Sequence, residues 1–410
     1  MDNATHAIVG LLVAEVVIQY RGRRGRVSTA GFLASSRWVS ALANNLADLD
    51  SLYAKRLGGK LGYLLQHRGY THTVPAALAI GFTLWAVWLG MRRRALTRAD
   101  RWWLLVLSLG GALLHIAFDA CNNYGVHPFW PLFDGWLYGD CLFIIEPWLW
   151  VFAVPALYPA LTNRWAKRAL GAVLAAGVGL AWLLRIAPWG VALALTLGTL
   201  AALRACYRLS SRHRLYFALA GWGAVFVAFA GASRLGRASV ARELSARPDE
   251  HLEEIVMTPA PGNPLCFSVV TVSTRRGDYL LRAARASALP TVLDAEACRV
   301  QATGLTLGLR APSIRSNETV YWEGDWQRPL DELVGLDASH CLVHALLVFA
   351  RAPFWKPLPN QRLLLGDLRF DRDPDYDFDE LEVPGHPEAG QCLRWIPPWR
   401  PPRESLLRGR

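Results

Sequence analysis

Long apolar segments fill the first 235 residues of the chain and do not recur after them. Each is close to the roughly 20 residues that a helix needs to cross the hydrocarbon core of a bilayer. The candidate spans are residues 4–20, 31–47, 74–90, 103–119, 141–161, 168–187, 189–205 and 215–232. The second, which contains Arg37 and several serines, could equally be an amphipathic helix packed inside the bundle. The pattern predicts an α-helical integral membrane bundle of about eight spans.

Basic residues in the loops predict the orientation of this bundle. They gather in alternate loops, at residues 21–26, 92–101, 164–168 and 204–214. The positive-inside rule places these loops in the cytoplasm. The formal net charge of +11 therefore does not indicate nucleic acid, and no nucleic-acid partner is expected. The start of the first span, the loops 48–73 and 120–140, and everything after residue 233 then lie on the extracytoplasmic (periplasmic) side of a cell inner membrane. The first segment is expected to be retained, because its basic residues follow the apolar stretch.

The chain changes character near Arg234. From there it is charged and rich in proline, with short stretches of alternating polarity that are typical of strands. The expected strands are 265–272, 278–282, 319–322, 342–349 and 362–370, after a helical linker at 242–254 and before an irregular tail at 395–402. Three domains are expected: a membrane-embedded metal-site helical domain (1–165), additional transmembrane helices (166–233) and an extracytoplasmic β-rich, α+β domain (234–410).

Four of the seven cysteines lie in the C-terminal domain, where disulfides persist outside the cytoplasm. They are Cys266, Cys298, Cys341 and Cys392. Four cysteines allow three pairings. The sequence does not decide among these pairings or between them and free buried thiols.

Seven acidic and histidine side chains sit at the ends of apolar segments that the topology places on one side of the membrane. They are His6, Asp48, Asp50, His67, His72, His115 and Asp119, from a chain with 10 histidines. Oxygen and imidazole ligands suit zinc or manganese-type divalent ions. A metal site that is open to water favours hydrolysis.

His115 and Asp119 lie four residues apart at the outer end of a span, so they share one helical face and can hold one metal or bridge two. The alternative is a helix-end histidine that hydrogen-bonds to the neighbouring carboxylate. A titratable pair inside a span is expensive and tends to be functional.

His67 and His72 flank a glycine that can let the chain turn, so both imidazoles could point inward. A surface loop with two solvated histidines is the alternative. Arg68, between them, is placed to clamp an anionic oxygen such as that of a phosphate. Its structural alternative is an ion pair with Asp48, Asp50 or Asp140.

Asp48 and Asp50 follow the second segment, where alternate carboxylates can meet one ion, or one can ligate while the other orients a histidine or accepts a proton. Asp and Asn also end helices and form turns without any metal. His6 opens the first span, and its interest comes from the topology that places it beside the others.

Other polar residues near this face have less certain roles. Asp140 is a candidate to complete the site, and Glu146 lies one or two turns deeper. His127 and Asp134 are interpreted as loop residues. The aromatic group at 129–138 is typical of an interfacial belt, and it could equally line an entrance for an acyl chain.

These residues carry a resemblance. Together they resemble the YdjM-type (LexA-regulated) membrane-bound metal-dependent hydrolase family. The matching motifs are Thr5-His6, Asp48-Leu49-Asp50, the block from His67 to His72, and His115-xxx-Asp119 followed by Asn122 to Gly125. The resemblance covers roughly residues 1–180. That family is similar to zinc-dependent phospholipase C and P1 nuclease, which hold up to three zinc ions and cleave phosphoesters. By resemblance, the ligands would be His6, an aspartate of the 48–50 pair, one or both of His67 and His72, His115 and Asp119. This chain lacks a second helical HxxxE pair, which makes one or two ions the expected count.

The sequence is thus interpreted as a membrane-bound metal-dependent hydrolase, with zinc the expected metal and a phosphoester or lipid-linked phosphate as substrate at the extracytoplasmic face. Asp50 or Asp48 is the candidate general base, and Arg68 the candidate anion clamp. Two alternatives stay open. A divalent metal transporter would place polar residues at mid-span. A non-catalytic membrane scaffold that displays the C-terminal domain would keep its partner binding after the metal is removed.

Overall fold

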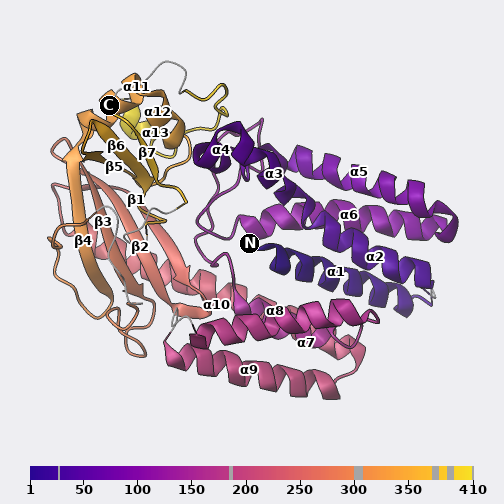
Figure 1. Ribbon diagram of the computed structural model, residues 1–410. Coiled ribbons are helices and arrows are strands. Elements are labelled where there is room, and N and C mark those ends of the chain that lie inside the picture. The colour runs from indigo at the N-terminus through magenta and orange to yellow at the C-terminus, as the bar shows by residue number, and fades with distance from the viewer. Residues whose placement is uncertain (26–27, 184–187, 300–307, 372–377, 386–391, 409–410) are drawn as a thin grey trace.

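The helices of the bundle lie within the first 245 residues, and the strands of the described part of the chain lie beyond one end of the bundle (Figure 1). The computed structural model describes residues 1–25, 28–183, 188–299, 308–371, 378–385 and 392–408. The bundle is built from α1 (Asn3–Arg23), α2 (Ala30–Ala43), α5 (Val74–Arg92), α6 (Arg98–Asp119), α7 (Pro147–Leu157), α8 (Arg164–Leu183), α9 (Trp189–Arg208) and α10 (Ser211–Ser245).

Six helices of the described part of the chain are long and apolar enough to cross a membrane: α1, α5 with the turn after it, α6, α8, α9 and α10. The α+β membrane class is therefore confirmed. The helices found within 31–47 and 141–161 are shorter than predicted, at 14 residues for α2 and 11 for α7. At ~1.5 Å per residue α7 is about 16 Å long, against ~30 Å of hydrocarbon. Pro147 starts α7, because proline is accommodated in the first turn of a helix, and a second proline, Pro155, lies inside α7 near its end. The count of about eight spans stays a prediction.

Helix caps fix which residues reach the end of the bundle nearest the strands. The Asp2 carboxylate accepts from Thr5 N (3.0 Å), which starts α1 and places His6 in its first turn. A capping box between Thr97 and Asp100 starts α6, whose last turn carries His115 and Asp119. The starts of α1 and α5 and the ends of α2 and α6 therefore meet at one end of the bundle.

A chain of short helices covers this end between α2 and α5. It consists of η1 (Leu46–Asp50), α3 (Ser51–Ala54), η2 (Lys55–Leu57), α4 (Gly59–Gln66) and η3 (Tyr70–His72), and a further turn, η4 (Arg93–Ala95), lies at the far end of α5. Gly59 has a φ of +62°, a left-handed conformation that glycine adopts without strain, where the chain turns from η2 into α4.

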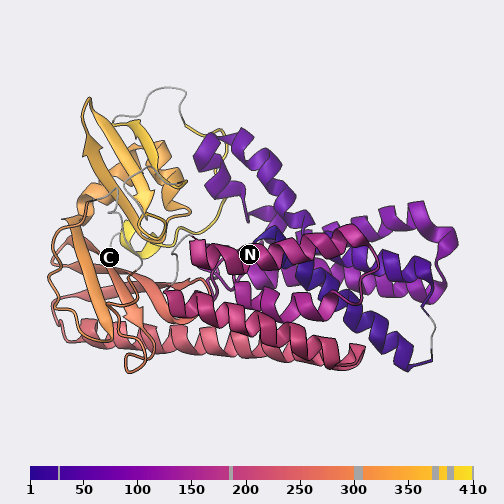
Figure 2. The same cartoon turned by 60° about the horizontal axis from the view of Figure 1, so that its bottom comes forward.

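The C-terminal half contains two antiparallel sheets, seen as separate layers in Figure 2. The first has the order β1 (His251–Ala260), β2 (Asn263–Arg275), β3 (Asp278–Ser287) and β4 (Val320–Pro329). The second has the order β5 (Pro353–Leu358), β6 (Arg362–Asp367) and β7 (Leu381–Pro384). The helices α11 (Leu330–Ser339), α12 (Cys341–Leu347) and α13 (Glu404–Leu407) accompany them.

Strands are found within four of the five predicted strand ranges: 265–272, 278–282, 319–322 and 362–370. The strand predicted at 342–349 is wrong, because this segment forms α12; a short apolar run does not distinguish a buried helix from a buried strand. The helical linker predicted at 242–254 is also wrong. The helix α10 ends at Ser245, and β1 begins at His251. The disulfides are Cys266–Cys298 and Cys341–Cys392, one of the three pairings that the sequence allowed.

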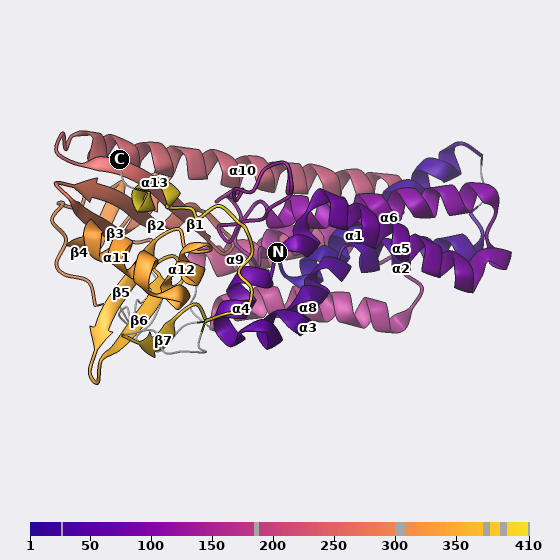
Figure 3. The same ribbon diagram turned by 90° about the horizontal axis from the view of Figure 1, so that it is seen from above.

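The hydrophobic core continues from the membrane part into the strands. The long helix α10 runs from the bundle along the four-stranded sheet (Figure 3), where Val240 and Leu244 pack against Met257, Phe267 and Trp322. The core on the other side of that sheet includes Leu61, Leu64 and Leu65 of α4 as well as Tyr124 and Trp136. The boundary predicted after residue 233 thus lies inside a continuous helix, and the strands pack against the segments that cover the bundle end.

Candidate metal centre

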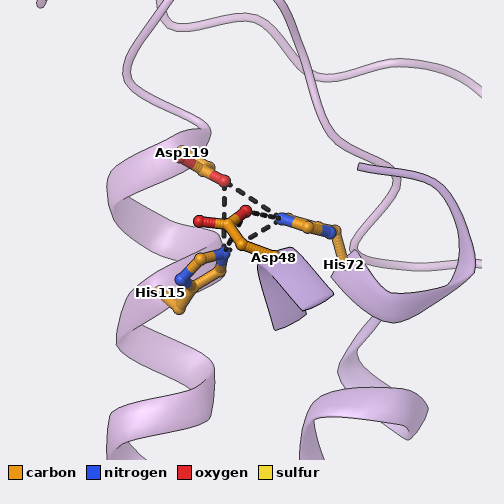
Figure 4. A group of neighbouring side chains, drawn as sticks. All are labelled: Asp48, His72, His115 and Asp119. Atoms are coloured by element: carbon orange, nitrogen blue, oxygen red, sulfur yellow. Dashed lines mark hydrogen bonds and ion pairs between the residues drawn. The ribbon is translucent and has the colours of Figure 1, made fainter. Parts of the chain in front are cut away.

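Four side chains from three segments converge where the bundle meets the strands. Asp48 comes from η1, His72 ends η3, and His115 and Asp119 occupy the last turn of α6 (Figure 4). One possible ligand atom from each residue lies within 4.8 Å of the others. His72, His115 and Asp119 are fully buried. The four form a group that could hold a metal ion, and it is called the four-residue cluster below.

The distances inside the four-residue cluster fit tetrahedral coordination. The Nε2 atoms of His72 and His115 are 2.9 Å apart. Asp119 Oδ2 lies 3.1 and 3.3 Å from these two nitrogens, in that order. Asp48 Oδ1 lies 3.4 and 3.5 Å from them. Ligands at ~2.0–2.2 Å from a tetrahedral zinc ion lie roughly 3.3–3.6 Å from one another, so an ion fits after shifts of a few tenths of an ångström.

Hydrogen bonds outside the cluster fix the tautomer of both histidines. His115 Nδ1 donates to the Asn44 carbonyl oxygen (2.7 Å), which can only accept. Thr71 Oγ1 donates to Asp50 Oδ2 (2.7 Å), so the His72 Nδ1–H donates to Thr71 Oγ1 (2.9 Å). Both Nε2 lone pairs therefore face the cluster. This is the outer arrangement that metal-binding histidines normally have.

The cluster requires positive charge. Asp119 Oδ2 is buried next to the Nε2 atoms of His72 and His115, and as long as both nitrogens carry lone pairs it has no hydrogen-bond donor within the described part of the chain. Burial alone would lower the pKa of His72, but hydrogen bonds to the surrounding carboxylates, that of Asp119 first, outweigh burial and raise the pKa to about 10. A cation held between the two imidazoles and the two carboxylates would meet the same requirement without the extra proton.

Asp50 lies one step behind the four-residue cluster. Its carboxylate accepts from His67 Nδ1 (2.8 Å), the Arg68 backbone N–H (3.0 Å) and Thr71 Oγ1, and it lies 3.4 Å from His72 Nδ1. Asp50 and His67 also form a second possible metal group with Asp48. The hydrogen bonds to Asp50 hold the turn from His67 to His72 in place.

Arg68 has a buried guanidinium and a φ of +60°. Its Nη2 lies 3.1 Å from Asp119 Oδ1, and its Nη1 donates to Asn122 Oδ1 (2.9 Å). The ion pair is thus with Asp119, and not with Asp48, Asp50 or Asp140, the partners that the sequence suggested. Arg68 Nε makes no hydrogen bond to any described residue.

His6 packs against the four-residue cluster from α1. Its ring stacks on His115 with 3.9 Å between ring centroids, and its Nε2 lies 3.3 Å from Asp119 Oδ1. The α-amino group of Met1 contacts the same oxygen. His6 therefore lies beside the oxygen of Asp119 that faces Arg68, while the other oxygen faces His72 and His115.

Asp140 does not complete the site. Its carboxylate receives two hydrogen bonds from Arg351 (2.7 and 3.0 Å) and one from Arg237 (2.8 Å). Burial alone would raise the pKa of Asp140, but these guanidinium groups, Arg351 first, hold it below its usual value. Glu146 caps α7 and accepts from Trp148 N and Gly262 N, so it too serves the packing.

Sequence reasoning missed Asn44, Thr71 and Asn122 as site residues. Asn44 accepts the hydrogen bond from His115 with its backbone carbonyl, and the Thr71 hydroxyl connects His72 to Asp50. Neither role can be predicted from residue type or spacing. Asn122 forms the turn after α6 by accepting from Tyr124 N (2.9 Å), and it also holds Arg68. Its position three residues after Asp119 was the one available signal.

Comparison with known proteins agrees with the resemblance stated above. Residues 1–194 match the model of the family described as YdjM inner membrane protein. A protein of Bacillus subtilis (strain 168), described as uncharacterized protein YfhP, is 24% identical over 159 residues. The matched region is 38% of this chain and 45% of that protein, so the chain spans less than half the length of this relative. No solved structure matches the chain. The more distant similarity to zinc-dependent phospholipase C and P1 nuclease stays a prediction.

Proposed function

Residues 1–194 belong to the YdjM inner membrane protein family, and from this premise we propose that the chain is a membrane-bound metal-dependent hydrolase of a phosphoester or lipid-linked phosphate. The family description and the membrane-length helices place the chain in the inner membrane, in contact with lipid. We propose further that the four-residue cluster opens at the extracytoplasmic face, together with the C-terminal strands. The alternation of basic loops with the cluster segments supports that orientation.

One observation carries the proposal: two imidazole nitrogens converge with two carboxylates, at nitrogen–nitrogen and nitrogen–oxygen distances of 2.9–3.5 Å, and Asn44 and Thr71 fix the tautomers. Two nitrogen and two oxygen ligands suit zinc. One ion is proposed in the four-residue cluster. The group of Asp48, Asp50 and His67 shares Asp48 with it, so a second ion would require Asp48 to bridge.

A divalent cation bound in the cluster would lower the pKa of water toward ~7 and polarise a phosphoryl oxygen. The chain's own residues then have separate tasks. Asp119 is held by Arg68, which keeps one of its oxygens turned toward His72 and His115. Arg68 has Nε left to donate to a non-bridging phosphate oxygen.

Asp50 and His67 are proposed as the pair that accepts the proton of the attacking water. Burial alone would raise the pKa of Asp50, but hydrogen bonds from His67 and His72 outweigh burial and lower it, so Asp50 is ionised at neutral pH. Because Asp50 Oδ1 is 2.8 Å from His67 Nδ1, the carboxylate can orient the ring and stabilise it after it takes up a proton. The general-base role predicted for Asp50 is thereby exerted through His67.

The test is a phosphoester screen on the full chain in detergent, before and after chelation. Wild type should hydrolyse at least one phosphoester class, lose this activity with the chelator and regain it with zinc or manganese. His115→Ala should be inactive, whereas His344→Ala, whose side chain is half exposed in the C-terminal half, should be as active as wild type. Metal-loaded wild type that turns over no phosphoester would reject the hydrolase and leave a metal-binding or transport protein.

A further inference from the structure

A cavity of about 490 Å³ opens beside the four-residue cluster. This volume is in the range of ~300–1,000 Å³ typical of small-molecule sites. Its walls come from the short helices, from the loop after α6 and from the C-terminal half. Its lining includes the polar residues Lys55, Lys60, Arg68 and Asn122 and the apolar residues Phe370 and Phe378. Arg68 lines the cavity and also contacts Asp119, so this one side chain connects the cavity to the cluster.

The polar lining of the cavity suits an anion. Lys55, Lys60 and Arg68 are positively charged, and the described lining residues include no carboxylate, although Arg68 is paired with Asp119 behind the lining and Lys60 Nζ also donates to the Glu380 carbonyl oxygen (3.3 Å). Two buried donors of this lining, Arg68 Nε and Asn122 Nδ2, have no acceptor among the described residues. Buried donors without a partner are costly, so the oxygens of a bound anion would stabilise them.

The remaining lining and the surface around the cavity suit an apolar chain. Phe143, Ile144, Phe370 and Phe378 line the cavity, and Ile144 and Phe378 are 41% and 42% exposed. The helices next to the cavity also expose apolar side chains: Leu49, Leu52 and Leu57 are 52%, 67% and 53% exposed, in the same segment as Lys55. Exposed leucines next to lysines are typical of a surface at the bilayer interface.

We propose that this cavity binds one phosphate-bearing lipid, with the phosphate between Lys55, Lys60 and Arg68 and the start of the apolar chain against Phe370 and Phe378. This inference rests on the proposed function only in that the phosphate would lie next to the cluster. It assigns a role to the C-terminal half, which supplies one wall of the substrate site. The pairing of Phe370 with Phe378, at 5.0 Å between ring centroids, gives this wall its apolar surface.

The test measures binding without turnover. Chelated full-length chain in neutral detergent is titrated with phosphatidic acid, phosphatidylcholine or inorganic phosphate, and bound lipid is counted by native mass spectrometry. One phosphatidic acid per chain should bind, and more tightly than phosphatidylcholine. Lys55→Gln should weaken this binding about fivefold, since one lysine near an anionic headgroup contributes ~1 kcal/mol. Lys167→Gln, a matched charge removal at the start of α8, should leave it unchanged.

A second variant distinguishes binding of the apolar chain of the lipid from binding of its phosphate. Phe378→Ala should weaken phosphatidic acid binding several-fold, by loss of apolar contact, and leave inorganic phosphate binding as in wild type. Phosphatidic acid that binds no better than inorganic phosphate or phosphatidylcholine would overturn the inference. So would equal binding in wild type, Lys55→Gln and Phe378→Ala. Lipid binding without any phosphoester turnover would reject the hydrolase but support the cavity, whereas turnover of soluble phosphoesters without lipid binding would do the reverse.

Discussion

Replacing Asp50 with asparagine should lower the metal affinity of the chain although Asp50 lies behind the four-residue cluster. Its carboxylate accepts from His67 Nδ1, Arg68 N and Thr71 Oγ1 at 2.7–3.0 Å and fixes the tautomer of His72 through Thr71. An amide keeps one accepting oxygen and turns an NH₂ group toward one of these donors. Loss of such an outer partner typically costs 10–100-fold in metal affinity, about 1.4–2.7 kcal/mol.

The assay is the zinc content of purified chain, measured across a series of chelator concentrations. The midpoint for Asp50→Asn should fall about 10–100-fold below that of wild type. For Thr71→Val, which removes the hydroxyl group between Asp50 and His72 but keeps the shape of the side chain, the midpoint should fall by a smaller factor. Asp134→Asn, an exposed carboxylate paired with Arg400, serves as the control and should match wild type. Equal midpoints for wild type, Asp50→Asn and Thr71→Val would refute the idea that Asp50 positions the metal ligands.

Three further outcomes are expected. Arg68→Lys should keep its metal and lose most phosphoester turnover, because lysine has the charge but not the planar fork that reaches both Asp119 and a phosphate oxygen; unchanged turnover would refute the clamp. Asp140→Asn should lower the free energy of unfolding by about 3 kcal/mol near pH 7, because it leaves the buried Arg351 without this carboxylate. The pKa of Asp140 is lowered on folding, so the stability that the ionised Asp140 contributes is fully present above pH ~3.9 and is lost as the pH falls through the folded-state pKa. In thermal melts, the difference in melting temperature between wild type and Asp140→Asn should therefore shrink below about pH 4. Reporter fusions after Arg94 and Pro248 should give opposite signals, cytoplasmic and extracytoplasmic, and same-side signals would contradict the orientation.

The parts of the site that local periodicity controls could be predicted from the sequence. His115 and Asp119 lie four residues apart in an apolar helix, so their shared face follows from helix geometry. Alternation of basic loops then placed Asp48 and His72 at the same end of the bundle, and the structure brings them together. His6 and Asp50 lie next to these four, and His67 is hydrogen-bonded to Asp50.

Contacts between distant parts of the chain could not be predicted. Asp140 resembled a ligand in sequence because it lies at the mouth of the predicted span 141–161, but its partner Arg351 is 211 positions away. Arg369 likewise donates to the Asn123 carbonyl oxygen (2.7 Å), next to Asn122, so the C-terminal half holds the loop that holds Arg68. No local sequence pattern predicts such a long-range contact. The same limit explains α12, whose apolar run fits a buried helix or a buried strand until its packing is known.

The metal centre is tested most directly by zinc X-ray absorption spectroscopy of the detergent-purified chain, combined with elemental analysis. We expect one bound ion per chain with two imidazole nitrogens and carboxylate oxygens at ~2.0–2.2 Å. His115→Ala should show one imidazole fewer and a lower metal content, while the exposed variant His251→Ala should match wild type. A purified, folded chain that takes up no stoichiometric zinc or manganese, or an ion whose ligands are unchanged in His115→Ala, would contradict the metal centre and the hydrolase built on it.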